Sequence, residues 1–303
     1  MNPFLPFRDV VLVGKFEVLR ALKTWRALAL CALYAVATGG ATYVFTRLIG
    51  AMENTLAQQL GVAKTETPGA MLDTLIKSDM FQEMMASMVG SQDLALRVLE
   101  LPVLSLFFLW FSFLVTPFFA ATAASESIAS DVYTRAIRFE ALRTGRLELA
   151  LGRFAGQAAL TAVAMIGAGL VAWCVGMWCL RGHTGPDLAF ALTWMGLRGW
   201  LFGLPFVGLG LAASQWTASA AWARVLAIGL TVGSWASYAV LHWIPDWQPS
   251  LQFLTDGLVP LYPQAWMATL WEPTGWIAAG LSLVGISAAN LALGFVVFMR
   301  RDL

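Results

Sequence analysis

Long apolar segments alternate with shorter polar ones along the whole chain. A helix that crosses the hydrocarbon core of a bilayer needs about 20 mostly apolar residues. Because the polar gaps leave no room for a large separate domain, residues 1–303 are expected to form a single transmembrane domain of helices. The predicted spans are residues 25–49, 101–122, 154–180, 188–213, 219–242 and 275–299.

The start of the chain has a different, amphipathic pattern. At about 100° per residue, one helical face of residues 4–25 collects the apolar side chains and Gly14, and the opposite face collects charged ones such as Glu17. A basic amphipathic helix directly before a span is typical of the membrane interface, so we predict an interfacial helix here. The following apolar run continues past Ala37 through Phe45, so a cleaved signal peptide is not expected.

The distribution of lysine and arginine predicts the orientation of the spans. Cationic side chains are retained on the cytoplasmic side of short loops. Here they gather before the first span, between the second and third spans and after the last one. We therefore expect both termini to be cytoplasmic, in the cell (inner) membrane. Residues 50–100 are then an extracytoplasmic polar loop with helical patches, including a run from Ser78 to Glu100.

A second outer segment, residues 243–274, combines prolines with tryptophans and tyrosines. Proline interrupts helices, and aromatic rings favour the membrane interface. This segment is therefore predicted to be re-entrant, with short broken helices in the outer leaflet. Its prolines are Pro245, Pro249, Pro260, Pro263 and Pro273.

Composition excludes several classes of protein. The chain is 59% hydrophobic and 12% charged, whereas soluble domains carry about 25% charged residues. The sequence contains no basic patch interleaved with exposed aromatic residues, which is the pattern that indicates binding to nucleic acid. Cys31, Cys174 and Cys179 lie in apolar segments, where thiols behave as small hydrophobes. No nucleophile, base and acid can be assembled, so we expect neither catalytic nor cofactor residues.

The segment 125–146, between the second and third spans, is the most highly charged of the chain. The spacing of Asp131 and Arg135 suits an ion pair within one helix. Thr144 and Gly145 mark the end of that helix before another begins. We therefore predict a short helix docked at the inner membrane face.

The same segment resembles the first cytoplasmic loop of type-2 ABC permeases. That loop has a glutamate at the end of the second span, followed by a pattern like G-T-I-R-x-L-L-x-x-P-V-S-R-x-x-x-x-L-G-K. The resemblance extends to the topology of nearly the whole chain. The matching residues are Glu126, Ala136-Ile137-Arg138, Arg146 and Leu151-Gly152-Arg153, and the departures are Arg135 at the usual glycine and Arg143-Thr144-Gly145 at P-V-S.

The resemblance implies a permease subunit that moves a substrate with energy from a separate ATPase subunit, which binds ATP and Mg. It also implies a second permease copy. In that family the loop helix is a coupling helix that inserts into the ATPase, and the N-terminal helix braces the contact. Some relatives serve the maturation of copper enzymes. The residues expected to couple to the ATPase are Glu126, Asp131, Arg135, Arg138 and Arg146.

An alternative function uses the same inner contacts. In it, the chain transmits ATPase motion to an extracytoplasmic partner through residues 50–100. In either case the chain is not expected to hydrolyse ATP by itself. Gly14-Lys15 is followed by Phe16 and lacks the upstream glycine of a phosphate-binding loop.

Two features remain open from the sequence alone. Arg198 falls inside the fourth span, where a charge is costly, so it either lines a substrate path or pairs locally. Met80, Met84 and Met88 have the spacing of an apolar helix face and also of a thioether site for Cu(I), of which we favour the first.

Small residues recur four positions apart in three spans, the spacing that lets helices approach closely in lipid. Packing within one bundle is the favoured interpretation and a subunit interface is the alternative. The pairs are Gly152/Gly156, Gly199/Gly203 and Gly229/Gly233.

Overall fold

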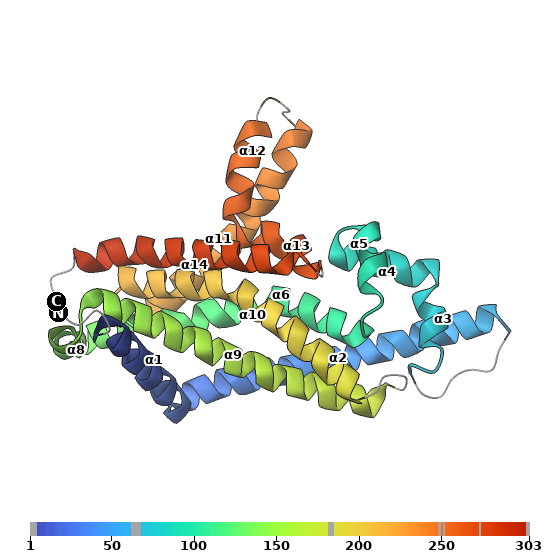
Figure 1. Ribbon diagram of the computed structural model, residues 1–303, viewed down its shortest axis with the longest axis horizontal. Helices are drawn as coiled ribbons and strands as arrows, with labels where there is room; N and C mark the ends of the chain where they lie inside the picture. The colour runs from blue at the N-terminus through green and yellow to red at the C-terminus, as the bar shows by residue number, and fades with distance from the viewer. Residues whose placement is uncertain are drawn as a thin grey trace.

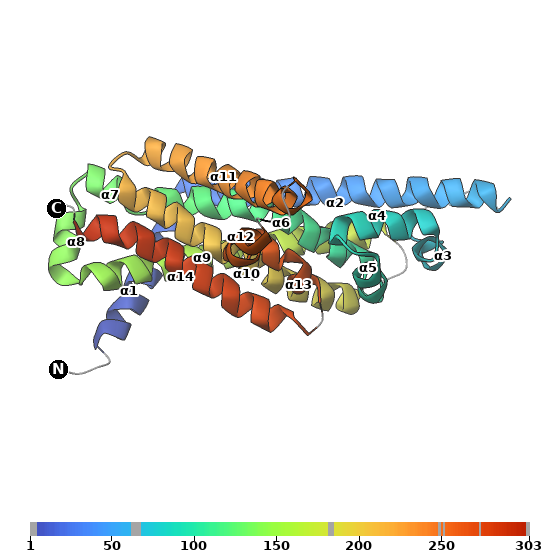
Figure 2. The same cartoon turned by 90° about the horizontal axis from the view of Figure 1, so that it is seen from above.

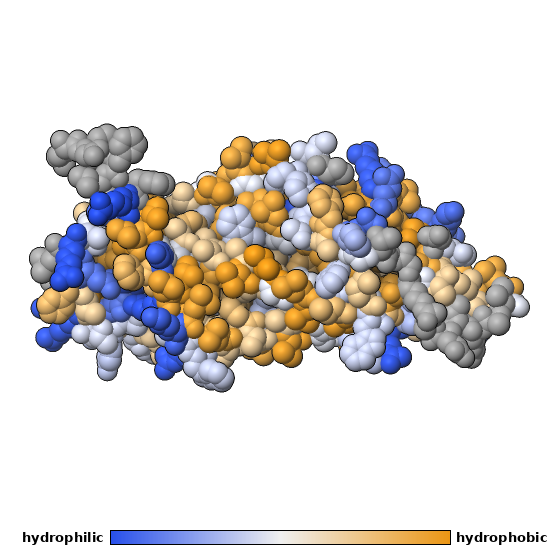
Figure 3. All heavy atoms as spheres, turned by 60° about the horizontal axis from the view of Figure 1, so that its bottom comes forward, coloured by the Kyte–Doolittle hydropathy of each residue, from blue (hydrophilic) through white to orange (hydrophobic). Residues whose placement is uncertain are grey.

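The protein is an elongated bundle of helices (Figure 1). Within the part of the chain that the structure describes there are helices and turns but no strand. Figure 3 shows hydrophobic side chains over the middle of the bundle and hydrophilic ones toward its two ends. The computed structural model describes residues 5–61, 68–180, 185–247, 250, 252–272 and 274–300.

Six helices of these ranges are long and apolar enough to cross a membrane. Each corresponds to one predicted span, so the predicted class, an all-α multi-pass membrane protein, is confirmed. The helices are α2 (Trp25–Gln59), α6 (Val103–Ser125), α9 (Arg146–Cys179), α10 (Gly185–Trp216), α11 (Ala220–Trp247) and α14 (Trp276–Met299).

Helix α10 lies at the centre of the bundle and packs against α6, α9, α11 and α14. Of the residues in the most apolar 18-residue stretch of α10, 72% are buried, whereas only 11% are buried in the corresponding stretch of α11. Aromatic rings fill the core beside α10: the Phe113 ring meets Phe202 edge-on at 4.8 Å and Trp271 at 5.8 Å. Helix α11 is therefore a peripheral element.

The bundle has two different ends (Figures 1 and 2). Helix α1 (Leu5–Lys23) and the short helices α7 (Ala129–Tyr133) and α8 (Ile137–Arg143) lie at one end, called here the α8 end. The opposite end carries α3 (Leu72–Ile76), α4 (Asp79–Val89) and α5 (Gln92–Val98).

At the end opposite to α8, helix α2 is longer than the predicted span 25–49. This helix continues beyond residue 49 to Gln59. The carboxylate of Glu53, which is fully buried, accepts backbone hydrogen bonds from Gly69 at 2.9 Å and Met71 at 3.0 Å. The extended end of α2 thus holds the segment that leads into α3, because a buried carboxylate needs such donors.

The predicted helical run from Ser78 to Glu100 is divided into two helices. Gly90, with a φ of 87°, adopts the left-handed conformation that ends helices, and it separates α4 from α5. The expected apolar face at Met80, Met84 and Met88 is borne out only in part: Met84 and Met88 pack partly against the core, whereas Met80 is 44% exposed. The buried row of α4 is Phe81, Met85 and Val89. The described residues contain no group of three His, Cys, Asp or Glu side chains that could hold a metal.

Short broken helices do form in the described part of residues 243–274, as predicted. However, α11 runs through Pro245 to Trp247, so this proline does not end the helix. Pro249 and Pro273 lie outside the described residues. The C-terminal part of α11 and α12 stand away from the bundle, and α13 returns to it (Figure 1). The pieces are α12 (Gln252–Leu258), the 3-10 turns η2 (Val259–Leu261) and η3 (Pro263–Trp266), and α13 (Met267–Trp271).

Glycines let α1 cross α9 at close range. A Cβ atom added at Gly152 would lie 2.5 Å from the Cβ of Val13, and one at Gly156 would lie 2.7 Å from the Cβ of Glu17. Such distances are far inside van der Waals contact. The pair Gly152/Gly156 therefore serves packing within the bundle.

The other two glycine pairs differ from each other. A Cβ at Gly199 would lie 2.7 Å from Met165 Cε, and one at Gly203 would lie 2.8 Å from Thr116 Cγ2, so this pair also packs inside. Nothing lies within 4 Å of the corresponding positions at Gly229 and Gly233 on α11. This third pair is on an open face.

The crossing of α1 and α9 can be tested by adding single methyl groups. Gly152→Ala should destabilise the protein by about 1–3 kcal/mol, because overpacking forces the two backbones apart. Gly167→Ala is the matched control on the same helix, since nothing lies within 4 Å of its Cβ position. Thermal unfolding in detergent measures both. Equal melting temperatures for the two variants would contradict the close crossing.

Candidate functional site

The charged segment 125–146 forms two short helices at the α8 end. The prediction of one helix is wrong, because α7 ends at Tyr133 and α8 begins at Ile137. Arg135 lies in the break with a φ of 61°, the only positive φ at a non-glycine residue among those described. Glycine adopts this conformation most readily, and glycine is the residue that the permease pattern has at this position. The predicted break at Gly145 is confirmed, since α9 begins directly after it.

A single buried arginine of α9 holds both short helices. Arg153 is 2% exposed, and its Nη2 lies 2.5 Å from Asp131 Oδ2 on α7 and 2.5 Å from Glu140 Oε2 on α8. Its Nη1 donates to the carbonyl of Ser127. A guanidinium has five donors in a rigid planar arrangement, which suits it to several partners at once. The position of the segment therefore depends on Arg153.

Helix α1 joins the same network from the other side. Arg20 Nη1 donates to both carboxylate oxygens of Asp131, at 3.1 and 3.0 Å. Asp131 thus pairs with Arg20 and Arg153, and the pairing with Arg135 predicted from the sequence is wrong. The helix break after Tyr133 removes the spacing on which that pairing depended.

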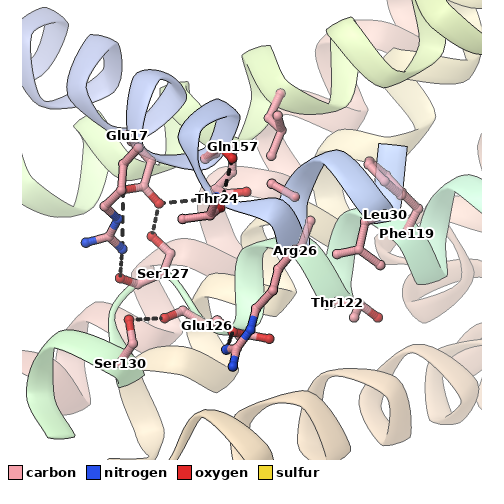
Figure 4. A pocket seen from close by; sticks show the side chains of 15 residues that line it. Glu17, Thr24, Arg26, Leu30, Phe119, Thr122, Glu126, Ser127, Ser130 and Gln157 are labelled. Atoms are coloured by element: carbon pink, nitrogen blue, oxygen red, sulfur yellow. Dashed lines mark hydrogen bonds and ion pairs between the residues drawn. The ribbon is translucent and has the colours of Figure 1, made fainter. Parts of the chain in front are cut away.

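Glu17 of α1 was expected on a polar, solvated face, but it is 6% exposed. Its Oε1 accepts hydrogen bonds from Ser127 Oγ and Gln157 Nε2, both at 2.8 Å (Figure 4). These donors compensate the burial of the carboxylate. The face of α1 that packs on α9 is therefore the one with Gly14 and Glu17.

The segment before α7 is also tied to the ends of the spans. Glu126 lies 3.6 Å from Arg26 at the start of α2 and 2.6 Å from Arg224 at the start of α11. Ser214, near the end of α10, accepts the backbone N–H groups of Ile128 and Ala129 at 2.9 and 2.8 Å. Four elements, α1, α2, α10 and α11, thus meet here in addition to α9.

The remaining predicted coupling residues divide into two kinds. Arg146 donates to the carbonyls of Phe298 and Met299 at 3.2 and 2.9 Å, so it caps the end of α14. Arg135 and Arg138 instead have exposed side chains.

Two aromatic residues beside these arginines were missed by the sequence analysis. Tyr133 is 78% exposed and Phe139 is 74% exposed. Tyrosine and arginine are enriched among the residues that contribute most to protein–protein binding. Their position inside a highly charged segment was the sequence signal that could have identified them as exposed. Together, Tyr133, Arg135, Arg138 and Phe139 form what we call the outward face of α7 and α8.

Arg198 lies apart from this network and is 2% exposed. Its Nη1 donates to the carbonyls of Leu270 and Trp271, at 2.9 and 3.2 Å, at the end of α13. Its guanidinium also lies 5.6 Å from the centre of the Trp194 ring. The side chain therefore has local partners and holds the end of α13 to α10, while a role in a substrate path stays a prediction.

The fold defines the chain as a multi-pass α-helical membrane protein. Comparison with protein families and with curated proteins gives no match.

Loss of the central guanidinium should strongly destabilise the protein. Arg153→Met leaves Asp131 and Glu140 without their shared partner, at a cost of about 3–5 kcal/mol. Arg153→Lys should also destabilise, because a lysine cannot reproduce the planar geometry. Thermal unfolding in detergent is the measurement. The control Arg138→Lys, at an exposed position, should change stability by less than about 0.5 kcal/mol. Wild-type stability of Arg153→Met would contradict the central role.

Proposed function

We propose that the chain is the membrane-spanning permease subunit of a type-2 ABC transporter, which moves a substrate across or out of the membrane. The observation that carries this proposal is the two-sided construction of α7 and α8. Their buried side is bound to α9 through Arg153. Their outward face presents arginines and aromatic rings with exposed side chains.

This construction suits the transmission of force. A partner that moves the outward face displaces Asp131 and Glu140, and both carboxylates are held by Arg153 at 2.5 Å. The same displacement reaches α11 through the pairing of Glu126 and Arg224. Such a network couples one docking surface to several spans, as a permease driven by an external motor requires.

The motor in this proposal is a separate ABC ATPase, which binds ATP and Mg. The permease itself contributes no phosphate-binding loop, since Gly14-Lys15 lacks the surrounding pattern. We also propose that a second copy of the chain completes the transporter. The open pair Gly229 and Gly233 on the peripheral helix α11 favours this, because small residues on a free face allow close helix association in lipid.

A second candidate function is transmission of ATPase motion to an extracytoplasmic partner. The observation that favours it is the rigid junction at the outer end. Glu53 on the extended part of α2 binds the backbone at Gly69 and Met71. Motion of α2 would therefore reach α3 directly. Removal of α4 and α5 distinguishes the two functions. Transmission to an extracytoplasmic partner requires that activity is lost while the ATPase still binds, whereas transport requires that activity is kept.

Charge reversal on the outward face tests the ATPase contact. Arg135→Glu and Arg138→Glu together should leave the bundle folded, because both side chains are exposed. The double variant should lose the ATPase, since removing paired interface charges costs about 2–5 kcal/mol. The measurement is ATP hydrolysis and native mass spectrometry of the tagged chain purified from its native membranes. Wild type should carry two ATPase chains per two permeases.

The control for this experiment is Arg97→Glu, a charge reversal at an exposed position of the opposite end. It should leave ATPase binding unchanged. The chain expressed without partners should show no ATP hydrolysis. Unchanged binding in the double variant, or hydrolysis by the isolated chain, would contradict the proposal.

The proposed orientation places the α8 end in the cytoplasm and residues 50–100 outside. In a cysteine-free background, Ala70→Cys should react with an impermeant thiol reagent in intact cells, because Ala70 is exposed. Arg138→Cys at the α8 end is the matched control and should react only after permeabilisation. The reverse labelling pattern would invert the topology.

A further inference from the structure

Helix α1 has one side on which apolar side chains remain exposed. Four of them lie within about 100° of one another around the helix, on the side opposite to Glu17. Between 38% and 53% of each side chain is exposed. Exposed apolar groups gathered on one face indicate a surface that another molecule covers. We call this the exposed face of α1, and its apolar members are Val11, Leu12, Leu19 and Leu22.

Two cationic side chains lie on the same face. Lys15 is three or four positions from Val11, Leu12 and Leu19, and Arg8 is three or four positions from the first two, so they are neighbours on the helix surface. Both cations are exposed. Among the described residues, no acidic side chain forms an ion pair with either of them. Their alkyl stems can lie along the apolar surface while the charged groups reach a polar layer.

The depth of α1 in the bundle matches such a layer. The helix crosses α9 at Gly152 and Gly156, close to where the charged start of α9 gives way to residues 154–180, which carry no charged side chain. Figure 3 shows hydrophilic side chains beside hydrophobic ones at this end of the bundle. Trp25, directly after α1, is 81% exposed, and tryptophan rings favour the membrane interface. The exposed face of α1 therefore meets the interface between lipid and water.

We propose that the exposed face of α1 binds anionic phospholipids in the leaflet at the α8 end. The four apolar side chains insert among the lipid molecules, and Arg8 and Lys15 bind the headgroups. Charge complementarity selects anionic lipids, because each cation near an anionic membrane surface strengthens binding about fivefold. The proposal does not depend on the ATPase.

The opposite side of α1 connects this lipid contact to the segment 125–146. Arg20 lies 3.0 Å from Asp131 of α7, and Glu17 accepts a hydrogen bond from Ser127 Oγ at 2.8 Å. A lipid that binds α1 in its docked position stabilises the docked state by mass action. Anionic lipid therefore holds α7 and α8 more firmly in place through α1.

The first test uses the unmodified chain in detergent and native mass spectrometry. Phosphatidylglycerol should bind about 25-fold more tightly than phosphatidylcholine with the same acyl chains, which is fivefold for each of Arg8 and Lys15. This preference should fall as salt is added. Equal binding of the two lipids would overturn the proposal. Soluble glycerol phosphate lacks acyl chains and should bind weakly, and binding as tight as that of the lipid would overturn the assignment to a membrane lipid.

A double variant locates the binding surface. Arg8→Gln with Lys15→Gln should keep the thermal stability of the lipid-free protein, because both side chains are exposed. It should bind phosphatidylglycerol about 25-fold more weakly. Lys77→Gln with Arg97→Gln removes an equal charge at exposed positions of the opposite end and should leave this binding unchanged. An equal loss in both double variants, or no loss in the first, would overturn the assignment to α1.

Hydrogen exchange tests the connection to α7 and α8. Saturating phosphatidylglycerol should slow amide exchange in both short helices of the unmodified chain, because local opening is suppressed when α1 is held. The same lipid concentration should have a much smaller effect in the variant with Arg8→Gln and Lys15→Gln. Unchanged exchange in the unmodified chain with the lipid bound would overturn the proposed effect on α7 and α8.

Discussion

The arrangement of the α8 end depends on one buried guanidinium. Helices α7 and α8 have only five and seven residues, and isolated helices shorter than about 12–15 residues are marginal in water. Arg153 supplies what the short helices lack, because it binds a carboxylate from each of them at 2.5 Å. The desolvation of three charges is offset only while all three remain together. The two helices therefore hold their positions as a unit with α9.

Buried charged groups on long helices stabilise the irregular segments at three places. Glu53 binds backbone N–H groups before α3, Arg153 binds the carbonyl of Ser127, and Arg198 binds the carbonyls that end α13. Irregular backbone is tolerated at membrane depth only where the protein satisfies its polar groups. A regular helix pairs its backbone N–H and C=O groups with each other and needs no side chain to do so. Its side chains can therefore form hydrogen bonds with the irregular backbone of a neighbouring segment. This division explains why costly charges are retained in apolar surroundings.

The six long apolar helices and the broken segment 243–274 could be predicted because local sequence determines them. Apolar length predicts a span, and clustered prolines predict interruptions. The break at Arg135 carried no such signal, since neither glycine nor proline occupies it. Glu17 was placed on the wrong face because helical periodicity describes one helix and not its neighbours. Its partner Ser127 is 110 residues away in sequence. The same limit applies to the glycine pairs. Gly152 and Gly229 each begin a pair with the same spacing in sequence, but Gly152 is crowded by α1 whereas nothing lies within 4 Å of the Cβ position at Gly229.

The contrast between α10 and α11 suggests how a displaced loop would act on the bundle. Helix α10 is central, so moving it would disrupt close-packed contacts on several sides, which is costly. Helix α11 has few buried residues, and elements with few buried contacts open at the lowest free energy. Yet the first turns of α11 carry Arg224, which is paired with Glu126 of the segment 125–146 at 2.6 Å. The same segment is also hydrogen-bonded to Ser214 of α10, through the N–H groups of Ile128 and Ala129. A displacement of the segment would therefore act on both helices, and α11 would yield before α10 because it has fewer buried contacts to break.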